Sequence, residues 1–179
     1  SLGAGGIAVV RAAATPAAFV PIAPIRVLDT RVALGLPNPL VNGKAETLRV
    51  TGTIPVILPT GGIGTAEPVP AGAAGITANV TVVSPTTIGW VSVRPGDATG
   101  TPTTSSLNMT APGVVVPNSV TVALPASGPN AGHLNLYFHG TEPGATTHLL
   151  TDIVGYYTHS ESGPGPTGPP GAQGPAGAP

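Results

Sequence analysis

Apolar and polar residues alternate along most of the chain between residues 25 and 158. In the run 76–82, the even positions are Ile, Ala, Val and Val, and the odd positions are Thr, Asn and Thr. A period of two is typical of antiparallel strands that bury one face. The same alternation recurs at 47–51, 90–94, 119–124 and 133–139, and a last apolar run covers 149–157.

Prolines separate these runs, at positions where a missing N–H does no damage to a sheet. They are Pro85, Pro95, Pro102, Pro112, Pro117, Pro125 and Pro129. No stretch offers three turns of helix with caps. We therefore predict an all-β domain over residues 25–158, with about seven or eight antiparallel strands in a sandwich, jelly roll or barrel. The stretch 54–70 is expected to be a long loop or a ragged pair of strands.

Residues 1–24 are expected to form a separate N-terminal extension. Three prolines between positions 16 and 24 argue against a helix there. A short apolar strand could add to the open sheet edge of another subunit. The alternatives are an edge strand of its own domain or a frayed terminus. The residues that favour a strand are Ile7, Ala8, Val9 and Val10.

The last fifteen residues carry glycine at every third position, and proline fills five of the ten other places. This is the pattern of the collagen triple helix, in which three chains wind together and only glycine fits at the axis. We predict a homotrimer, with 159–164 as a linker and 165–179 as the triple helix. Either the preceding domain trimerises and sets the register, or more collagen follows. A disordered linker is the alternative. The glycines are Gly165, Gly168, Gly171, Gly174 and Gly177.

Charge is sparse, with 6 basic and 7 acidic residues among 179. That argues against nucleic-acid binding, which needs a basic face, and against a polybasic membrane anchor. No apolar run approaches 18 residues, so no membrane span is predicted. A surface this poor in charge favours packing against further copies of the chain. The absence of cysteine excludes disulfides and thiolate chemistry.

The first residues contain neither methionine nor a charged leader segment. They look like a mature end left after processing, which favours secretion; a sequence that begins partway along a longer chain is the alternative. No nucleophile elbow, phosphate-binding loop or dinucleotide fingerprint occurs in the chain. We therefore predict no catalytic residue, no cofactor and no metal site.

Four charged residues are candidates for a joint role near the ends of the β-rich region. Asp29 and Arg31 are two positions apart and would share a face on a strand. The two aspartates could both bond the arginines. The prediction is a buried ionic cluster that ties the first strand to the last, with a ligand or glycan pocket as the alternative. Acid–base catalysis is disfavoured because neighbouring arginines hold carboxylates ionised. The four residues are Arg26, Asp29, Arg31 and Asp152.

Histidines and aromatic residues offer weaker signals. His133 and His139 fall on one strand face about 20 Å apart, too far for one metal ion. The alternative is a metal or anion site formed by three copies of one histidine around the threefold axis of a trimer. Asn79 and Asn108 fit the glycosylation sequon. The aromatic residues are interpreted as too scattered for a stacking platform, and the pair before the tail is expected where three chains meet. They are Trp90, Tyr137, Tyr156 and Tyr157.

A set of motifs, in order, carries a family resemblance. Residues 26–31 read RVLDTR, residues 105–108 read SSLN, and residues 152–157 read DIVGYY. Over 25–158 the chain resembles an all-β domain of secreted and cell-surface bacterial proteins that begins with RxLDTR, has SNLN in its middle and ends in DVxGYY or DVxGYF. This chain departs at Ser106, where asparagine is more usual. The resemblance implies an extracellular accessory or structural module, often beside cell-wall-active domains, with no reaction to carry over.

The tail separately resembles bacterial and phage collagen-like stalks. Together these observations predict a secreted structural subunit of a trimeric extracellular fibre or filament, without enzymatic activity. The alternatives are a receptor- or glycan-binding head of a tail fibre or adhesin, and an accessory domain of a cell-wall enzyme.

Overall fold

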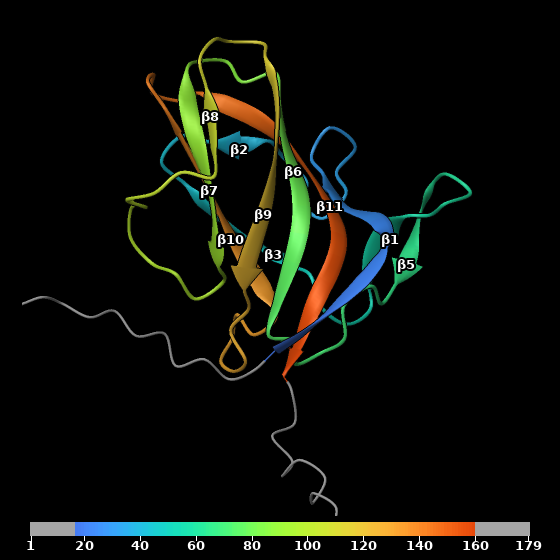
Figure 1. Ribbon diagram of the computed structural model, residues 1–179. Helices are drawn as coiled ribbons and strands as arrows, with labels where there is room; N and C mark the ends of the chain where they lie inside the picture. The colour runs from blue at the N-terminus through green and yellow to red at the C-terminus, as the bar shows by residue number, and fades with distance from the viewer. Residues whose placement is uncertain (1–16, 160–179) are drawn as a thin grey trace, which may run out of the picture.

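The computed structural model describes residues 17–159, and every regular element in that range is a β-strand (Figure 1). The expectation of an all-β region is confirmed there, and no helix in this range could cross a membrane. The strands are β1 (Ala17–Asp29), β2 (Leu40–Val41), β3 (Ala45–Arg49), β4 (Ile54–Ile57), β5 (Ile63–Ala66), β6 (Gly75–Val83), β7 (Gly89–Pro95), β8 (Leu107–Met109), β9 (Val115–Ala123), β10 (His133–Gly140) and β11 (Thr146–His159).

Two antiparallel sheets make a sandwich-like fold. The larger has the order β1-β11-β6-β9, with β2 paired to β11, and the smaller has the order β3-β10-β7-β8. Strands β4 and β5 form a separate hairpin. The core lies between the sheets, because alternate residues of β6 and the apolar residues of β10 are buried in one cluster. Phe138 is the largest of the fully buried side chains.

The stretch 54–70 forms the strand pair rather than a featureless loop. Strand β4 pairs with β5 through a turn that contains Gly61 and Gly62, both with positive φ values of 84° and 81°. Glycine adopts this backbone region without steric cost. The hairpin joins the main core because Val56 is fully buried.

Two prolines that were expected between strands lie within them, Pro117 in β9 and Pro95 at the end of β7, and this corrects the prediction. Pro117, expected between strands, lies inside β9 opposite Thr81. Strand β9 is at one edge of its sheet, so a missing N–H on its free side costs no ladder bond. The opposite edge strand, β1, contains Pro21 and Pro24, and its register shifts between Pro21 and Ile25. A register shift is the other setting in which a strand tolerates proline.

The first strand starts at Ala17, so it crosses the boundary expected at residue 25. Ala17 pairs with His159, and the two ends of the described chain therefore lie side by side at one end of the sheet (Figure 1). The predicted exchange strand 7–10, most of the linker and the glycine repeat lie outside the described residues.

Candidate functional site

Arg26 and Asp152 form the centre of the predicted ionic cluster. They are direct partners on neighbouring strands β1 and β11. Arg26 donates from Nε to Oδ1 at 2.8 Å and from Nη2 to Oδ2 at 2.9 Å, the two-pronged geometry that arginine makes with carboxylates. The hydrogen bond to Asp152 raises the pKa of Arg26 above its ordinary value. The side chains are 32% and 22% exposed, so this pair is half-buried rather than buried.

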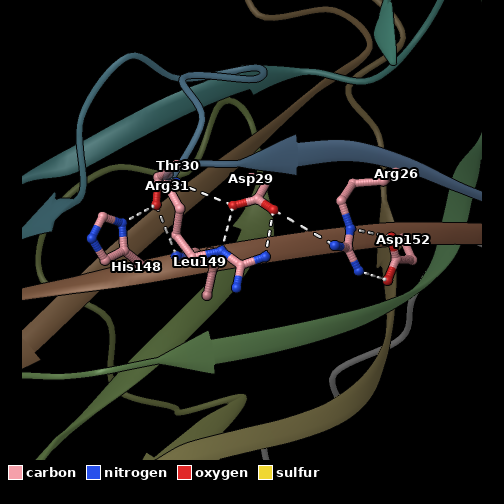
Figure 2. A network of polar contacts seen from close by, with 7 residues as sticks. All are labelled: Arg26, Asp29, Thr30, Arg31, His148, Leu149 and Asp152. Carbon is pink, nitrogen blue, oxygen red and sulfur yellow. Dashed lines mark hydrogen bonds and ion pairs between the residues drawn. The ribbon is translucent and has the colours of Figure 1, made fainter. Parts of the chain in front are cut away.

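Asp29 and Arg31 form a second pair at the end of β1. Arg31 donates from Nε and Nη2 to the two carboxylate oxygens at 2.9 and 2.7 Å, and its backbone N–H donates to Oδ1 at 3.1 Å. The hydrogen bonds from Arg31 lower the pKa of Asp29, and they outweigh the burial that would raise it. Arg26 Nη1 lies 3.6 Å from Asp29 Oδ2, which links the two pairs into one row (Figure 2).

Thr30 continues the connection to the last strand beyond the charged residues. Its backbone N–H donates to the Leu149 carbonyl at 3.2 Å, and its Oγ1 accepts from the Leu149 N–H at 3.1 Å. Oγ1 also lies 2.9 Å from His148 Nδ1 (Figure 2). The hydroxyl therefore takes the place of a ladder carbonyl where the chain leaves β1.

A tight turn after Thr30 explains why these side chains converge. Asp29 and Leu34 exchange two backbone hydrogen bonds of 3.1 Å, which closes the turn. Ala33 has a positive φ of 57°, and Gly35 follows with 75°. A Cβ on Gly35 would lie 2.6 Å from the Val27 carbonyl oxygen, so this position requires glycine. The pair of Asp29 and Arg31 is thus made across a turn, and not along one strand face as predicted.

Ser106, the position that departs from the SNLN pattern, performs a comparable task at β8. Its Oγ accepts from the Val93 N–H at 3.0 Å, its own N–H donates to the Val91 carbonyl at 2.8 Å, and its carbonyl accepts from Asn118 Nδ2 at 2.7 Å. Ser106 therefore fastens the entry of β8 to β7 and β9.

The charged row consists of ion pairs that stabilise the structure. Both carboxylates are engaged by guanidinium groups, and Asp29 is held ionised, so it has no proton to transfer. Within residues 17–159, no group of three His, Asp or Glu side chains is placed to hold a metal ion. A pocket of about 540 Å³ beside Arg26 and Asp152 is lined otherwise by apolar residues such as Leu58 and Ile57. The charges of Arg26 and Asp152 are paired with each other, and both residues also line this pocket.

An aromatic row on the smaller sheet corrects the view that the aromatic residues are scattered. Trp90 on β7 stacks on Tyr137 and on His139 of β10, with ring centroids 5.7 and 5.2 Å apart. Arg94 lies over the Tyr137 ring at 5.9 Å and donates to Asn135 at 2.9 Å. Because the rings cover one another's faces, the row braces β7 against β10. Only the register of the two strands brings these residues together, and no single run of sequence contains that information.

The two tyrosines that end the last motif point in opposite directions. Tyr156 packs against the core, whereas Tyr157 lies on the outer face with its ring 5.1 Å from that of Phe19. Neighbouring strand residues alternate between faces, so the two tyrosines lie on opposite faces of the sheet, and their contact with further chains stays a prediction. The sequons at Asn79 and Asn108 are exposed, and His133 bonds the Ala131 carbonyl at 2.8 Å.

No known protein family, curated protein or solved structure matches this chain. The family resemblance of the motifs stays a prediction.

Proposed function

We propose that the protein is a secreted structural subunit of a trimeric collagen-like fibre. The β-domain is the head that brings three chains together and sets their register. The observation that carries the proposal is the run of five Gly-X-Y triplets that begins six residues after the end of β11. Such a run has a stable partner only in two further chains of the same kind.

A trimeric head supplies what a short repeat lacks. Three free tails must find one another from dilute solution, whereas tails held on one head meet at an effective concentration in the millimolar range. Five triplets are few for an independent triple helix. The head therefore acts as the nucleus of the stalk.

The position of β11 suits a load-bearing role. This strand leads into the tail and is paired on both sides, with β1 and with β6. A pull along the tail acts parallel to β11, so many backbone hydrogen bonds share the load in shear. The bond between Arg26 and Asp152 joins the same two strands and resists the same sliding.

The charge-poor composition favours further self-assembly outside the cell. We propose that the segment Ile7–Val10 adds as a strand to a neighbouring trimer. Because Ala17 lies beside His159, this segment starts from the stalk end of the head. Ile7 is ten residues from Ala17, so the segment reaches at most roughly 35 Å from the start of β1, which allows it to pass to a head in direct contact.

The triple helix is tested by circular dichroism of the full chain on heating. We expect the circular dichroism signal of polyproline II structure to disappear in one cooperative transition. Gly171→Ala should lower the temperature of this transition or abolish it, because a methyl group does not fit at the axis of the triple helix. Ala172→Ser, at a position outside the axis, is the matched control. Absence of any such transition in the parent chain contradicts the proposal.

Assembly beyond the trimer is tested by negative-stain imaging of native material. We expect filaments, and isolated stalked heads after removal of residues 1–14. Unchanged filaments after that deletion would remove the role of the N-terminal strand and leave the trimeric stalk in place.

A further inference from the structure

Two rows of residues cross the outer face of the larger sheet at the end where the chain leaves it. Each row takes one residue from each of the strands β1, β11, β6 and β9, which are paired in register. The first row is Phe19, Tyr157, Gly75 and Ala123, and the second is Pro21, Gly155, Thr77 and Thr121. We call these eight residues the terminal face.

The terminal face holds an exposed apolar side chain on a flat base. Phe19 is 46% exposed although it is large and apolar. Its ring lies against Tyr157 and over Gly155, where a Cβ would collide with the ring. A Cβ on Gly75 would lie 2.9 Å from the Val122 carbonyl oxygen, so this position also stays without a side chain. Phe19 and Tyr157 are therefore the only large side chains on the terminal face, and the two glycines beneath and beside them are buried.

The terminal face is also uncharged. Strands β6 and β9 contain no ionisable residue along their whole length. Thr77 and Thr121 satisfy each other across these strands, with their hydroxyl oxygens 3.0 Å apart. Arg26 and Asp152, farther along the sheet, neutralise each other. The main energetic cost of a polar interface is the desolvation of unpaired charges. Burial of this face against further copies of the chain does not incur that cost.

The tail limits how far this face can lie from a threefold axis. In a triple helix the three chains run within a few ångströms of a common axis. The chain from His159 to Gly165 spans at most roughly 20 Å when fully extended. The end of β11, and with it Tyr157, must therefore lie close to the axis in any trimer that the repeat holds together.

We infer that the terminal face is the surface through which two further copies of this chain pack around the threefold axis, with Phe19 and Tyr157 as its apolar centre. This inference rests on the proposed trimer and specifies which surface forms it. Aromatic anchors surrounded by small uncharged residues are typical of the energetic centre of an interface.

Site-directed cross-linking of the full chain tests the inference, because the sequence contains no cysteine. Ala123→Cys places one thiol on the terminal face. Ile63→Cys places one on β5, at a position that is 57% exposed and outside this face. With a short bis-maleimide, we expect covalent pairs of chains from Ala123→Cys at a rate at least tenfold above that from Ile63→Cys. Sedimentation of the unlinked variants must show trimers, or assemblies of whole trimers, in both cases.

The outcomes separate this inference from the proposed function. If the chain is trimeric but cross-links mainly at Ile63→Cys, equally at both positions, or at neither, the terminal face is not the interface. The proposed trimeric stalk is not contradicted by these results. A chain that is not trimeric overturns both. As a second measurement, Phe19→Ser is expected to weaken the trimer. The chain concentration at which half of the trimers dissociate should rise by roughly tenfold or more. Ile63→Ser, which removes a large apolar side chain that is even more exposed, is expected to leave it unchanged.

Discussion

Arg26 and Asp152 face each other across β1 and β11, between two interruptions of the β1 ladder. The register shifts on one side between Pro21 and Ile25 and on the other between Arg26 and Leu28. Backbone hydrogen bonding is irregular at both places, and a slip there would turn side chains to the wrong face. The two hydrogen bonds of the ion pair therefore hold the register where the ladder is weakest.

Loss of this pair is expected to destabilise the head. Arg26→Met keeps the length of the side chain and removes both hydrogen bonds, and we expect the free energy of unfolding to fall by about 1–2 kcal/mol, discounted for the exposed part of the pair. Arg26→Lys keeps the charge without the two-pronged geometry and should lose about half as much. Denaturant unfolding of the full chain measures both. Equal stability of Arg26→Met and the parent would contradict the role.

The Asp29 carboxylate predicts a loss of stability in acid. Its folded pKa lies below the ordinary value of 3.8, chiefly because Arg31 donates to it. A group with a lowered folded pKa contributes stability that is complete above the unfolded pKa and disappears as the pH falls through the folded pKa. Thermal unfolding between pH 5 and pH 2 should therefore show a decline that is weaker in Asp29→Asn and in Arg31→Leu. An identical decline in all three chains would show that the pair is not the cause.

Thr30 offers a pair of substitutions that differ by one group. Thr30→Val removes the oxygen that accepts the buried Leu149 N–H, and an unpaired buried amide costs about 1–3 kcal/mol. Thr30→Ser retains the hydroxyl and should lose much less. Chemical denaturation distinguishes them, and amide hydrogen exchange at Leu149 should accelerate in Thr30→Val alone.

Thr151 on β11 predicts a gain in stability. Its side chain is fully buried, and its hydroxyl has no hydrogen-bond partner in the described structure. Thr151→Val keeps the shape and removes an unpaired polar group, so we expect stabilisation by about 1 kcal/mol. Thr147→Val is the control because the Thr147 hydroxyl donates to the His148 carbonyl at 3.2 Å. A loss of stability in Thr151→Val would mean that its hydroxyl is bonded after all.

The alternation of apolar and polar residues predicted the strands well where one face is buried. Strand β6 is an example, since its even positions enter the core as the sequence indicates. Proline was a poorer guide. The sequence does not reveal which strands become sheet edges, so Pro117 was assigned to a connection although it lies within β9.

The site required information that lies in the pairing of strands. The sequence predicted that Asp29 and Arg31 interact and that an ionic cluster links the first strand to the last. The turn that brings these two side chains together depends on Ala33 and Gly35, and the sequence did not predict it. The row of Trp90, Tyr137 and His139 exists only because β7 and β10 pair in one register. Likewise, only the bulge between Ile153 and Gly155 decides which of the last two tyrosines faces outward.

Sedimentation equilibrium of the full chain tests the central claim most directly, because it reports how many chains share one particle without labels. We expect masses of three chains, or of whole multiples of three where trimers join into filaments, and no particle of one chain on dilution. A mass of one chain at concentrations where the head remains folded would contradict it.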